Sequence, residues 1–533
     1  MAEKSMAHNA VVVGAMTFVS RVGGLVREVL MAYFFGAGVV KSAFDVAYRI
    51  PNLFRRLFGE GALSAALIPV YTETLEKQGK TEADRLASAV AGAMVALLGV
   101  LTAVGFLATF PLARHWGADG RWGQIMPLLR IMLPYAPLIC LAALIMGVLN
   151  SLKSFAVSAL APAFQNLCCI AVLVCVCPFL PGEGLLRIEV VAWSILVSGV
   201  VQVAVQLPVL RRYDVPLRLA FSEMASPGVR RVFKLMAPMA LAAGVMQVNV
   251  CLDSILAMWA GEWGPSALGY ADRLVYLPLA IVGTAFATVL LPTLSSFSAR
   301  ADYASFADAL ERTFRNVIVV MTPAAAGLIV LSTPIISLVY ETGAFDALST
   351  TRTANALIAY SAGLVAAGLH KVVVSAYYAR QDAHTPVVIG TAGVVLNLAM
   401  NVFFIWVLPV ELKPVGIAIA TSISSFLSCV ALMAILARRR AGGARLFRFG
   451  AVVHSALASL VAASLMAGAV CFCNGRLHDV LCAVLPLKLA LATGVAAMMA
   501  LGAAVYGGAM FVLSPSAVRE LVQDFRHRRG RKN

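Results

Sequence analysis

Long apolar runs, separated by only short polar segments, constrain this chain more than any other feature of the sequence. A membrane-spanning α-helix needs about 20 mostly apolar residues, and about fourteen runs of that length are present. They lie near residues 9–36, 41–71, 86–111, 124–150, 155–178, 190–210, 229–260, 264–296, 317–340, 350–379, 385–409, 414–437, 450–473 and 480–513. The runs lack the strict alternation of a transmembrane β-strand. The pattern therefore predicts an all-α polytopic membrane protein.

The composition excludes a water-soluble protein. Charged residues make up 13% of the 533 residues and hydrophobic residues 61%, whereas soluble domains carry roughly 25% charged residues. One large core cannot account for the excess, because soluble cores stop growing beyond roughly 250–300 residues. The 10 cysteines lie mostly inside apolar runs, which does not fit a secreted disulfide scaffold.

The distribution of basic residues predicts the orientation of the chain. If the N-terminus is inside, the inside loops hold 26 of the 42 Lys and Arg residues and the outside loops hold six. Such an excess in cytoplasmic loops follows the positive-inside rule. We therefore expect both termini in the cytoplasm, which requires an even number of spans. The basic tail, residues 515–533, is expected to lie against anionic lipid headgroups of the bilayer. A solvated tail that only helps to set the orientation of the chain is the alternative.

The other ten basic residues lie inside predicted spans, where a charge at the bilayer centre costs at least ~2.5–3.5 kcal/mol. Five of them crowd into the first two spans: Arg21, Arg27, Arg49, Arg55 and Arg56. The acidic residues there are fewer: Glu28, Asp45 and Glu60. The surplus predicts a water-filled cavity that receives an anion, and the planar guanidinium group suits phosphate. The alternative, in which each arginine is paired or reaches the membrane surface, stays open.

A weak internal duplication predicts two lobes. The stretch AYRI…LIPVY of the second span recurs as ADRL…LLPTL in the eighth, with Arg49 preceding Pro69 by 20 residues and Arg273 preceding Pro292 by 19. Six spans separate the copies, so the two lobes have parallel orientation. We expect a six-helix lobe at 1–213, a second at 214–441, two further helices at 442–514 and the tail at 515–533. This arrangement would put Arg273 across the cavity from the arginines of the first two spans.

Two features predict helix breaks in the same region. Gly23-Gly24 interrupts the first span and Pro51 the second. Breaks are tolerated where the backbone lines a cavity, and they can serve as hinges. Ordinary close packing of helices at glycine is the equally open alternative.

The segments SRVGGLVREVLMAYFFGAG and FDVAYRIPNLFRRLFGEGALSAALIPVY resemble the signature of the MurJ (MviN) family of lipid II flippases, in the MOP exporter superfamily. The resemblance covers essentially the whole chain, and PNLFRR-x-F-x-EGA is its most specific part. It implies movement of lipid II, the undecaprenyl-diphosphate-linked peptidoglycan precursor, from the inner to the outer leaflet of the bacterial cytoplasmic membrane by alternating access. Lipid II and the bilayer are then the expected partners, cell-wall synthesis proteins are candidate partners, and no nucleic acid is expected.

The resemblance also implies a substrate site. Its residues here are Arg21, Arg27, Arg55, Arg273, Asp45 and Glu60. The family tends to have an acidic residue just before the AF pair, where this chain has Ser42. The nearest carboxylate is Asp45, one turn later, and we expect it to take over that role.

Some members of the family hold a sodium ion in the C-terminal lobe. The matching positions here are Asp253, Asn397, Asn401 and Thr421, with a backbone carbonyl near Ile417. Asn397 and Asn401 are four residues apart and share a helix face, and hard cations prefer oxygen ligands. No other cofactor is expected. Hydrogen bonding between helices by the same side chains is the alternative.

Other functions stay open at this point. An exporter of another polyprenyl-diphosphate-linked glycan would use the same arginines. A MATE-like multidrug antiporter that exports cations would favour carboxylates in its cavity, so the arginines argue against it. A membrane enzyme would need a large outside loop with catalytic groups. The longest outside loops are short, and they contain His115 and Asp119 but no convincing catalytic pair. We therefore predict that the protein is not an enzyme.

Overall fold

The computed structural model describes residues 2–520 apart from 60, 61, 117–119, 153, 155, 182, 183, 442, 443, 448 and 518. The described chain is almost entirely helical, which confirms the predicted all-α fold. The exception is an antiparallel pair of two-residue strands, β1 (Arg440–Ala441) and β2 (Ala444–Arg445). Most of the predicted tail lies outside the described residues.

Several helices have the length and composition of membrane spans. Among the described residues, nine helices are long and apolar enough to cross a bilayer, or up to ten if the bent pair Ala347–Ala362 and Leu364–Ala379 forms one span. The chain is thus a multi-pass membrane protein. The count of fourteen spans stays a prediction.

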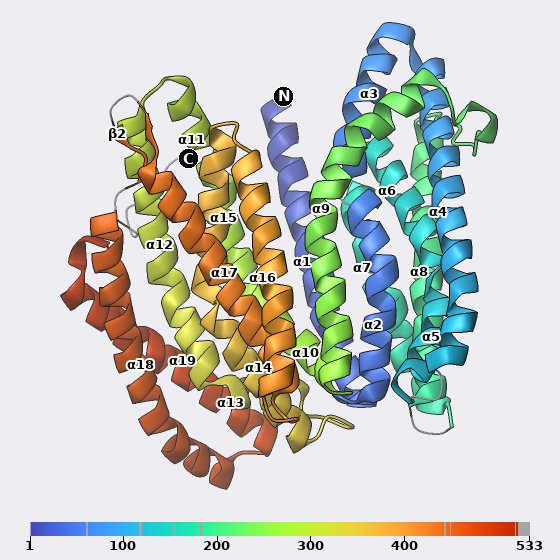
Figure 1. Cartoon of the computed structure of the whole chain (residues 1–533). Helices are drawn as coiled ribbons and strands as arrows, with labels where there is room; N and C mark the ends of the chain where they lie inside the picture. The colour runs from blue at the N-terminus through green and yellow to red at the C-terminus, as the bar shows by residue number, and fades with distance from the viewer. Residues whose placement is uncertain are drawn as a thin grey trace. The chain divides into compact units, whose positions relative to one another are not determined.

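The first compact unit comprises Met1–Ser266 and Thr342–Phe345. Its elements are α1 (Ala2–Phe35), α2 (Val39–Phe54), the π-helix η1 (Arg55–Gly59), α3 (Ala62–Gln78), α4 (Lys80–Trp116), α5 (Gly120–Met132), α6 (Tyr135–Ser151), α7 (Ala156–Cys175), the 3-10 turn η2 (Cys177–Phe179), α8 (Leu185–Arg212), the 3-10 turn η3 (Phe221–Glu223) and α9 (Pro227–Ala260) (Figure 1). Helix α1 packs on α7, α7 on α8, and α2 on α5 and α9.

The second unit comprises Ala267–Glu341 and Asp346–Asn533. Its elements are α10 (Gly264–Pro278), which begins at the end of the first unit, the π-helix η4 (Leu279–Thr284), α11 (Ala285–Ala299), α12 (Tyr303–Val330), α13 (Ser332–Tyr340), α14 (Ala347–Ala362), α15 (Leu364–Ala379), α16 (His384–Val407), α17 (Lys413–Arg438), β1, β2, α18 (Phe449–Val484) and α19 (Leu487–Leu513). Helix α16 packs on α17, and α18 packs on both α12 and α19. The lobe boundary predicted at 213/214 rests on the repeat and stays a prediction.

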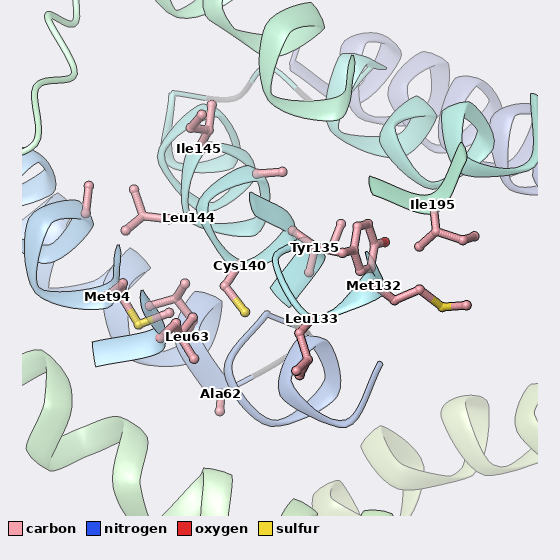
Figure 2. Close-up of a cluster of buried hydrophobic side chains, with 14 of the residues drawn as sticks. Ala62, Leu63, Met94, Met132, Leu133, Tyr135, Cys140, Leu144, Ile145 and Ile195 are labelled. Carbon is pink, nitrogen blue, oxygen red and sulfur yellow. The ribbon is translucent and has the colours of Figure 1, made fainter. Parts of the chain in front are cut away.

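A cluster of buried apolar side chains holds the first unit together. Figure 2 shows Leu63 of α3, Met94 of α4, Met132 of α5 and Leu144 of α6 gathered in it, and each of these side chains is fully buried. Lipid tails are as apolar as these side chains. The helices therefore associate through close packing and interhelical hydrogen bonds rather than through removal of apolar surface from water.

Two π-helical segments occupy matching places in the two copies of the repeat. The segment η1 begins six residues after Arg49, and η4 begins six residues after Arg273. A π-turn holds one more residue than an α-turn and disturbs the carbonyl hydrogen bonds around it. The carbonyl of Phe54, directly before η1, accepts a hydrogen bond from Cys140 Sγ at 3.6 Å. The matching positions of η1 and η4 agree with an internal duplication of this segment.

The expected break at Gly23-Gly24 is wrong for this structure. Helix α1 runs unbroken through both glycines. A Cβ added at Gly23 would lie 3.5 Å from Cβ of Asn166 on α7, and Asn166 Nδ2 donates to the carbonyl of Ser20 at 2.9 Å. Both glycines therefore face Asn166 of α7, with room for a Cβ in ordinary van der Waals contact. Pro51 lies inside α2, and the change to π geometry follows only at residue 55.

Two helices begin earlier than the apolar runs predict. Helix α4 begins at Lys80 and α12 at Tyr303, in segments interpreted as inside loops. The criterion of long apolar runs cannot detect polar first turns. The side chain of Asp302 caps α12 by accepting a hydrogen bond from the Ser305 backbone N–H at 3.1 Å.

Candidate functional site

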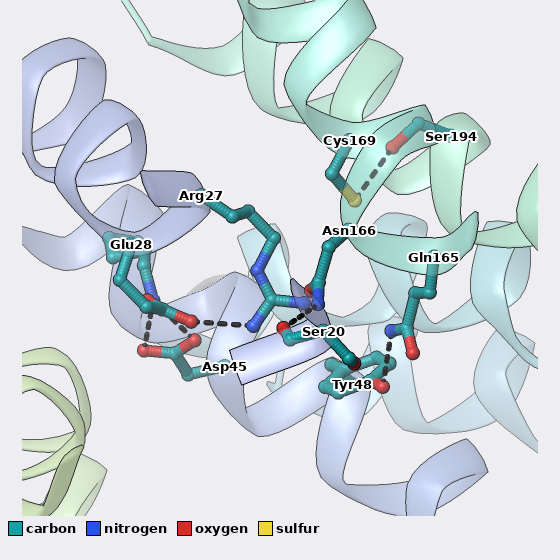
Figure 3. A network of polar contacts seen from close by, with 10 residues as sticks. Ser20, Arg27, Glu28, Asp45, Tyr48, Gln165, Asn166, Cys169 and Ser194 are labelled. Atoms are coloured by element: carbon teal, nitrogen blue, oxygen red, sulfur yellow. Dashed lines mark hydrogen bonds and ion pairs between the residues drawn. The ribbon is translucent and has the colours of Figure 1, made fainter. Parts of the chain in front are cut away.

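A buried ion pair on α1 forms the first part of the candidate site. Nη2 of Arg27 lies 2.6 Å from Oε1 of Glu28, and both side chains are largely buried. Figure 3 shows the guanidinium group of Arg27 directed at Glu28, with Asp45 of α2 beside them. Buried charges need such partners because the cost of removing each one from water is several kcal/mol.

Lys41 is a buried charged residue of this region that was not among the predicted site residues. It was counted among the six basic residues of the predicted outside loops, but it lies in the first turn of α2 with only 4% of its side chain exposed. Its Nζ lies 2.5 and 2.7 Å from the two carboxylate oxygens of Asp45, and 3.7 Å from Oε2 of Glu28. The i,i+4 spacing of Lys41 and Asp45 was the available signal.

This contact changes the charge balance that was inferred from the sequence. Glu28 and Asp45 were counted only against the arginines of the first two spans. In the structure both carboxylates also contact Lys41. Adding Lys41 to the five arginines leaves the number of carboxylates unchanged. The excess of positive over negative side chains in this region is therefore larger than the sequence indicated.

The two consecutive arginines at the start of η1 contact amide groups. Nε of Arg55 donates to Oδ1 of Asn52 at 2.9 Å, and Nη1 of Arg56 donates to Oε1 of Gln247 on α9 at 3.0 Å. Nε of Arg56 is buried and lacks a hydrogen-bond partner within the described part of the chain. Amide oxygens fix a guanidinium group without neutralising its charge, so these contacts preserve the positive potential.

A chain of uncharged polar groups extends the site from α2 toward α7. Nε2 of Gln165 donates to the hydroxyl of Tyr48 at 2.5 Å, and the hydroxyl of Tyr135 donates to Oε1 of Gln165 at 3.5 Å. Close by, Sγ of Cys169 and Oγ of Ser194 lie 3.2 Å apart (Figure 3). These hydrogen bonds fix the helices behind the charged groups.

Two of the remaining predicted substrate residues are exposed. Arg21 is exposed on α1, and Arg273 is exposed on α10 in the second unit. Glu60 lies outside the described residues. The predicted position of Arg273 across a cavity from the first two spans therefore stays a prediction.

Ser42, at the position of the family's acidic residue, is fully buried against the start of α10. Its Oγ donates to Oγ of Ser266 at 3.0 Å and lies 3.3 Å from the backbone N of Ser266, from which it accepts. Asp45 lies one turn later, where it contacts Lys41. Whether Asp45 performs the role of the family's acidic residue stays a prediction.

Three of the four predicted sodium ligands lie together in the second unit. Asn397 and Asn401 of α16 are buried, and Nδ2 of Asn401 donates to Oδ1 of Asn397 at 3.2 Å. Nδ2 of Asn397 donates to Oγ1 of Thr421 on α17 at 3.3 Å, and Thr421 donates to the carbonyl of Ile417 at 2.9 Å. The group thus joins α16 to α17 by hydrogen bonds.

The fourth predicted ligand, Asp253, lies on α9 in the first unit, where it accepts a hydrogen bond from Nδ2 of Asn249 at 3.3 Å. No cluster of three or more His, Cys, Asp or Glu side chains suited to a metal ion is found among the residues that the structure describes. The oxygens of Asn and Thr side chains are not among the four residue types of such clusters. Sodium binding by Asn397, Asn401 and Thr421 therefore stays a prediction.

Comparison with known proteins decides the family. Residues 31–505 match the family model described as "Lipid II flippase MurJ". The chain belongs to the lipid II flippase MurJ family. The Burkholderia cenocepacia lipid II flippase MurJ is 36% identical over 401 residues, which cover 74% of this chain and 77% of the relative. A probable lipid II flippase MurJ of Rhizobium tropici is 34% identical over 484 residues, covering 90% of this chain and 89% of the relative.

Solved structures agree with the MurJ fold. A structure described as lipid II flippase MurJ in an inward closed conformation aligns with a TM-score of 0.76 at 23% identity, covering 95% of this chain and 100% of that chain. An inward-facing MATE family transporter of the MOP superfamily aligns with a TM-score of 0.66 at 15% identity, covering 79% and 96%. These matches show the fold, and the MurJ family is a family of transporters rather than of enzymes.

Proposed function

We propose that this chain moves lipid II from the inner to the outer leaflet of the bacterial cytoplasmic membrane. The observation that carries the proposal is the pair Arg55 and Arg56, whose guanidinium groups are held by the amide oxygens of Asn52 and Gln247. Two fixed cations at the end of α2 suit an anion with several oxygens. The diphosphate of lipid II has this chemistry.

The bound diphosphate would be held by charge-assisted hydrogen bonds. A guanidinium group donates two parallel bonds to a phosphate and stays charged in a partly dry site. Arg27 differs from Arg55 because a carboxylate, Glu28, already occupies one of its donors. Binding at Arg27 therefore competes with an internal anion, which weakens the binding of the substrate there.

Alternating access provides the movement. In this proposal both termini lie in the cytoplasm, because the loops on the same side of the membrane as the termini carry the excess of basic residues. The headgroup enters from the cytoplasmic side while the lipid tail stays in the bilayer. An inside-negative membrane potential contributes ~2.3 kcal/mol per charge per 100 mV and favours outward movement of an anion. No covalent step is needed, so the proposal includes no enzymatic activity.

Sodium binding is a separable part of the proposal. Asn397, Asn401 and Thr421 offer amide and hydroxyl oxygens, which fit a hard cation. The ion would supply positive charge that orders these oxygens. A thermal unfolding series with Na⁺ against K⁺ at equal ionic strength tests this part, since equal midpoints throughout the series would exclude a selective site.

Depletion of the protein in its bacterium tests the main proposal. The amount of lipid II exposed on the outer leaflet is expected to fall as the protein is lost. Unchanged exposure after full depletion would overturn the assignment. If lipid II exposure is unchanged and another polyprenyl-diphosphate-linked glycan is no longer exported, the alternative substrate is the correct one.

A further inference from the structure

A lysine inside the predicted span 350–379 of the second unit has no role in the anion site proposed above. Lys371 is the eighth residue of α15, which packs on η4 and α11. Its Nζ donates to Oγ1 of Thr284 at 3.0 Å, and this contact is exposed. Thr284 is the last residue of η4 and lies near the middle of the apolar stretch Gly264–Ala299. A cation therefore lies at mid-depth of a helix that is long enough to cross the membrane.

Close approach of two backbones guides the lysine side chain to Thr284. Gly283 of η4 is buried, and a Cβ added there would lie 3.4 Å from Cα of Gly368 and 3.7 Å from Cδ of Lys371. Gly368 lies about one turn before Lys371 on α15. The aliphatic part of the lysine thus runs past Gly283. The position of the ammonium group is set by this packing as well as by its hydrogen bond.

The hydrogen-bond partner of the ammonium group is uncharged. The hydroxyl of Thr284 accepts one hydrogen bond, whereas an ammonium group has three donors. Over the described ranges of the chain, Lys371 forms no ion pair with a carboxylate. A charge inside the hydrocarbon is strongly unfavourable unless it meets water or an opposite charge. The remaining donors of Lys371 therefore suit an anion that a ligand supplies.

The spacing along the helix separates this cation from Arg273, the predicted diphosphate contact of the same unit. Arg273 of α10 and Thr284 of η4 are both exposed, and eleven residues separate them in the sequence. At ~1.5 Å per residue, Thr284 lies roughly 16 Å along the helix from Arg273. This distance is several times the length of a phosphate group. An anion at Lys371 is therefore a second group of the ligand, distinct from a diphosphate bound at Arg273.

We propose that Lys371 binds a carboxylate of the peptide part of lipid II and thereby selects the complete precursor over the bare polyprenyl diphosphate. The inference rests on the proposed function, because it requires the diphosphate to be bound at Arg273. Lipid II carries a short peptide on its sugar part, and the peptide ends in a carboxylate. An extended peptide covers about 16 Å in roughly five residues. Lys371 is then a specificity-determining residue that contacts the substrate directly.

The measurement is binding of three probes to the purified full-length protein in detergent: lipid II, lipid II with amidated peptide carboxylates, and undecaprenyl diphosphate. We expect Lys371→Met to bind lipid II about tenfold more weakly than the wild type, the size of one hydrogen bond to a charged group. Its affinity for the other two probes is expected to be unchanged. Lys371→Arg keeps the charge and should retain most of the affinity for lipid II. Lys77→Met serves as the matched control, because Lys77 forms an exposed i,i+4 pair with Glu73 on α3 at 2.9 Å.

The probes separate failure of the inference from failure of the proposed function. If the wild type binds none of the three probes better than undecaprenol, the proposed function fails. If the wild type binds them and Lys371→Met binds lipid II as tightly as the wild type does, the inference is wrong. Equal weakening of all three probes by Lys371→Met would also overturn it, since the lysine would then serve the diphosphate or the fold.

The wild type provides a readout that does not depend on the folding of a variant. Should Lys371→Met not fold, the comparison of lipid II with its amidated form in the wild type decides. Tighter binding of lipid II supports a cation that recognises the peptide carboxylate, and equal affinities for the two forms would overturn the inference.

Discussion

Oγ of Ser42 lies 3.0 Å from Oγ of Ser266, although 224 residues separate them in the chain. The backbone N–H of Ser266 also donates to Oγ of Ser42 at 3.3 Å, and neither side chain is exposed. The contact joins the first turn of α2 to the start of α10. Ser42 stands where the family tends to have an acidic residue. In this structure it forms a buried contact with Ser266 instead.

Ser42→Ala tests this contact. The variant leaves the N–H of Ser266 without this acceptor, and a lost buried hydrogen bond costs about 1–2 kcal/mol. We expect a lower thermal unfolding midpoint in detergent. Ser295→Ala is the control, because Ser295 is exposed and hydrogen-bonds only to the carbonyl of its own helix. Equal midpoints for the two variants would show that the contact adds no stability.

Gly36→Ala is expected to destabilise the first unit. Gly36 has a φ of +59°, and an added Cβ would clash with the carbonyl oxygen of Ala344. Left-handed backbone costs roughly 1–2 kcal/mol for a residue with a Cβ, and the clash adds to that cost. Gly99→Ala is the control, since a Cβ there meets no atom within 4 Å. The free energies of unfolding of both variants are to be compared with that of the wild type.

The pH dependence of stability is expected to include Asp382, between α15 and α16. Burial raises its pKa, but hydrogen bonds from Thr385 and Arg439 outweigh burial and hold the pKa of Asp382 well below its ordinary value. A lowered folded pKa contributes stability above the unfolded value of about 3.9, and this stability is lost as the pH falls through the folded pKa.

Asp382→Asn should therefore flatten the acid side of the stability profile. The difference from the wild type is expected to be present near neutral pH and to shrink below about pH 4. Its size is modest, about 1 kcal/mol, because Arg439 is 36% exposed and solvent screens the ion pair. Unfolding midpoints measured from neutral to acidic pH check the result, and parallel curves for the two proteins would contradict it.

Three single substitutions test the cationic site in a growth complementation assay. Arg27→Ala, Arg55→Ala and Arg273→Ala are each expected to fail at normal expression, because each removes a charge that the diphosphate would use. Arg85→Ala should support growth, since Arg85 is exposed and pairs with Glu82 on the same helix. Growth of all three test variants would contradict the proposed anion site.

The π-helical segment η4 is expected to matter for transport more than for folding. Deleting Ile281 removes the extra residue of the π-turn and lets the helix continue in α geometry with its flanking faces unchanged. Deleting Val289 in α11 instead rotates the following residues by about 100°. We expect the first variant to keep its unfolding midpoint but lose transport, and the second to lose both. A fully active Ile281 deletion would show that the π geometry is dispensable.

Prediction of the fold from the sequence succeeded because the signal is local. Each bilayer span requires its own apolar run, so the all-α architecture follows from hydropathy without any knowledge of contacts. Helix ends were less accurate, as the polar first turns of α4 and α12 show. The break expected at Gly23-Gly24 was wrong because Asn166, a residue distant in the sequence, packs there.

The candidate site could be predicted only in part. The signature residues Arg27 and Arg55 were recognised from their type and spacing, but nothing in the local pattern pointed to Gln247 as the partner of Arg56. Lys41 was assigned to a loop because it stands at the end of an apolar run, where basic residues usually face water. Its burial depends on Glu28 of a different helix, which a one-dimensional pattern does not show.

The sequence by itself determined that this chain is a multi-pass helical membrane protein, that its first two predicted spans are rich in arginine, and that it resembles the MurJ family. Each of these properties depends on residue type and on spacing along the chain. Only the tertiary structure decided which charges are paired, because the pairing of Lys41 with Glu28 and the contact of Arg56 with Gln247 depend on how helices meet. The free energy of a buried charge depends on its nearest partners within a few ångströms, and those partners come from other helices.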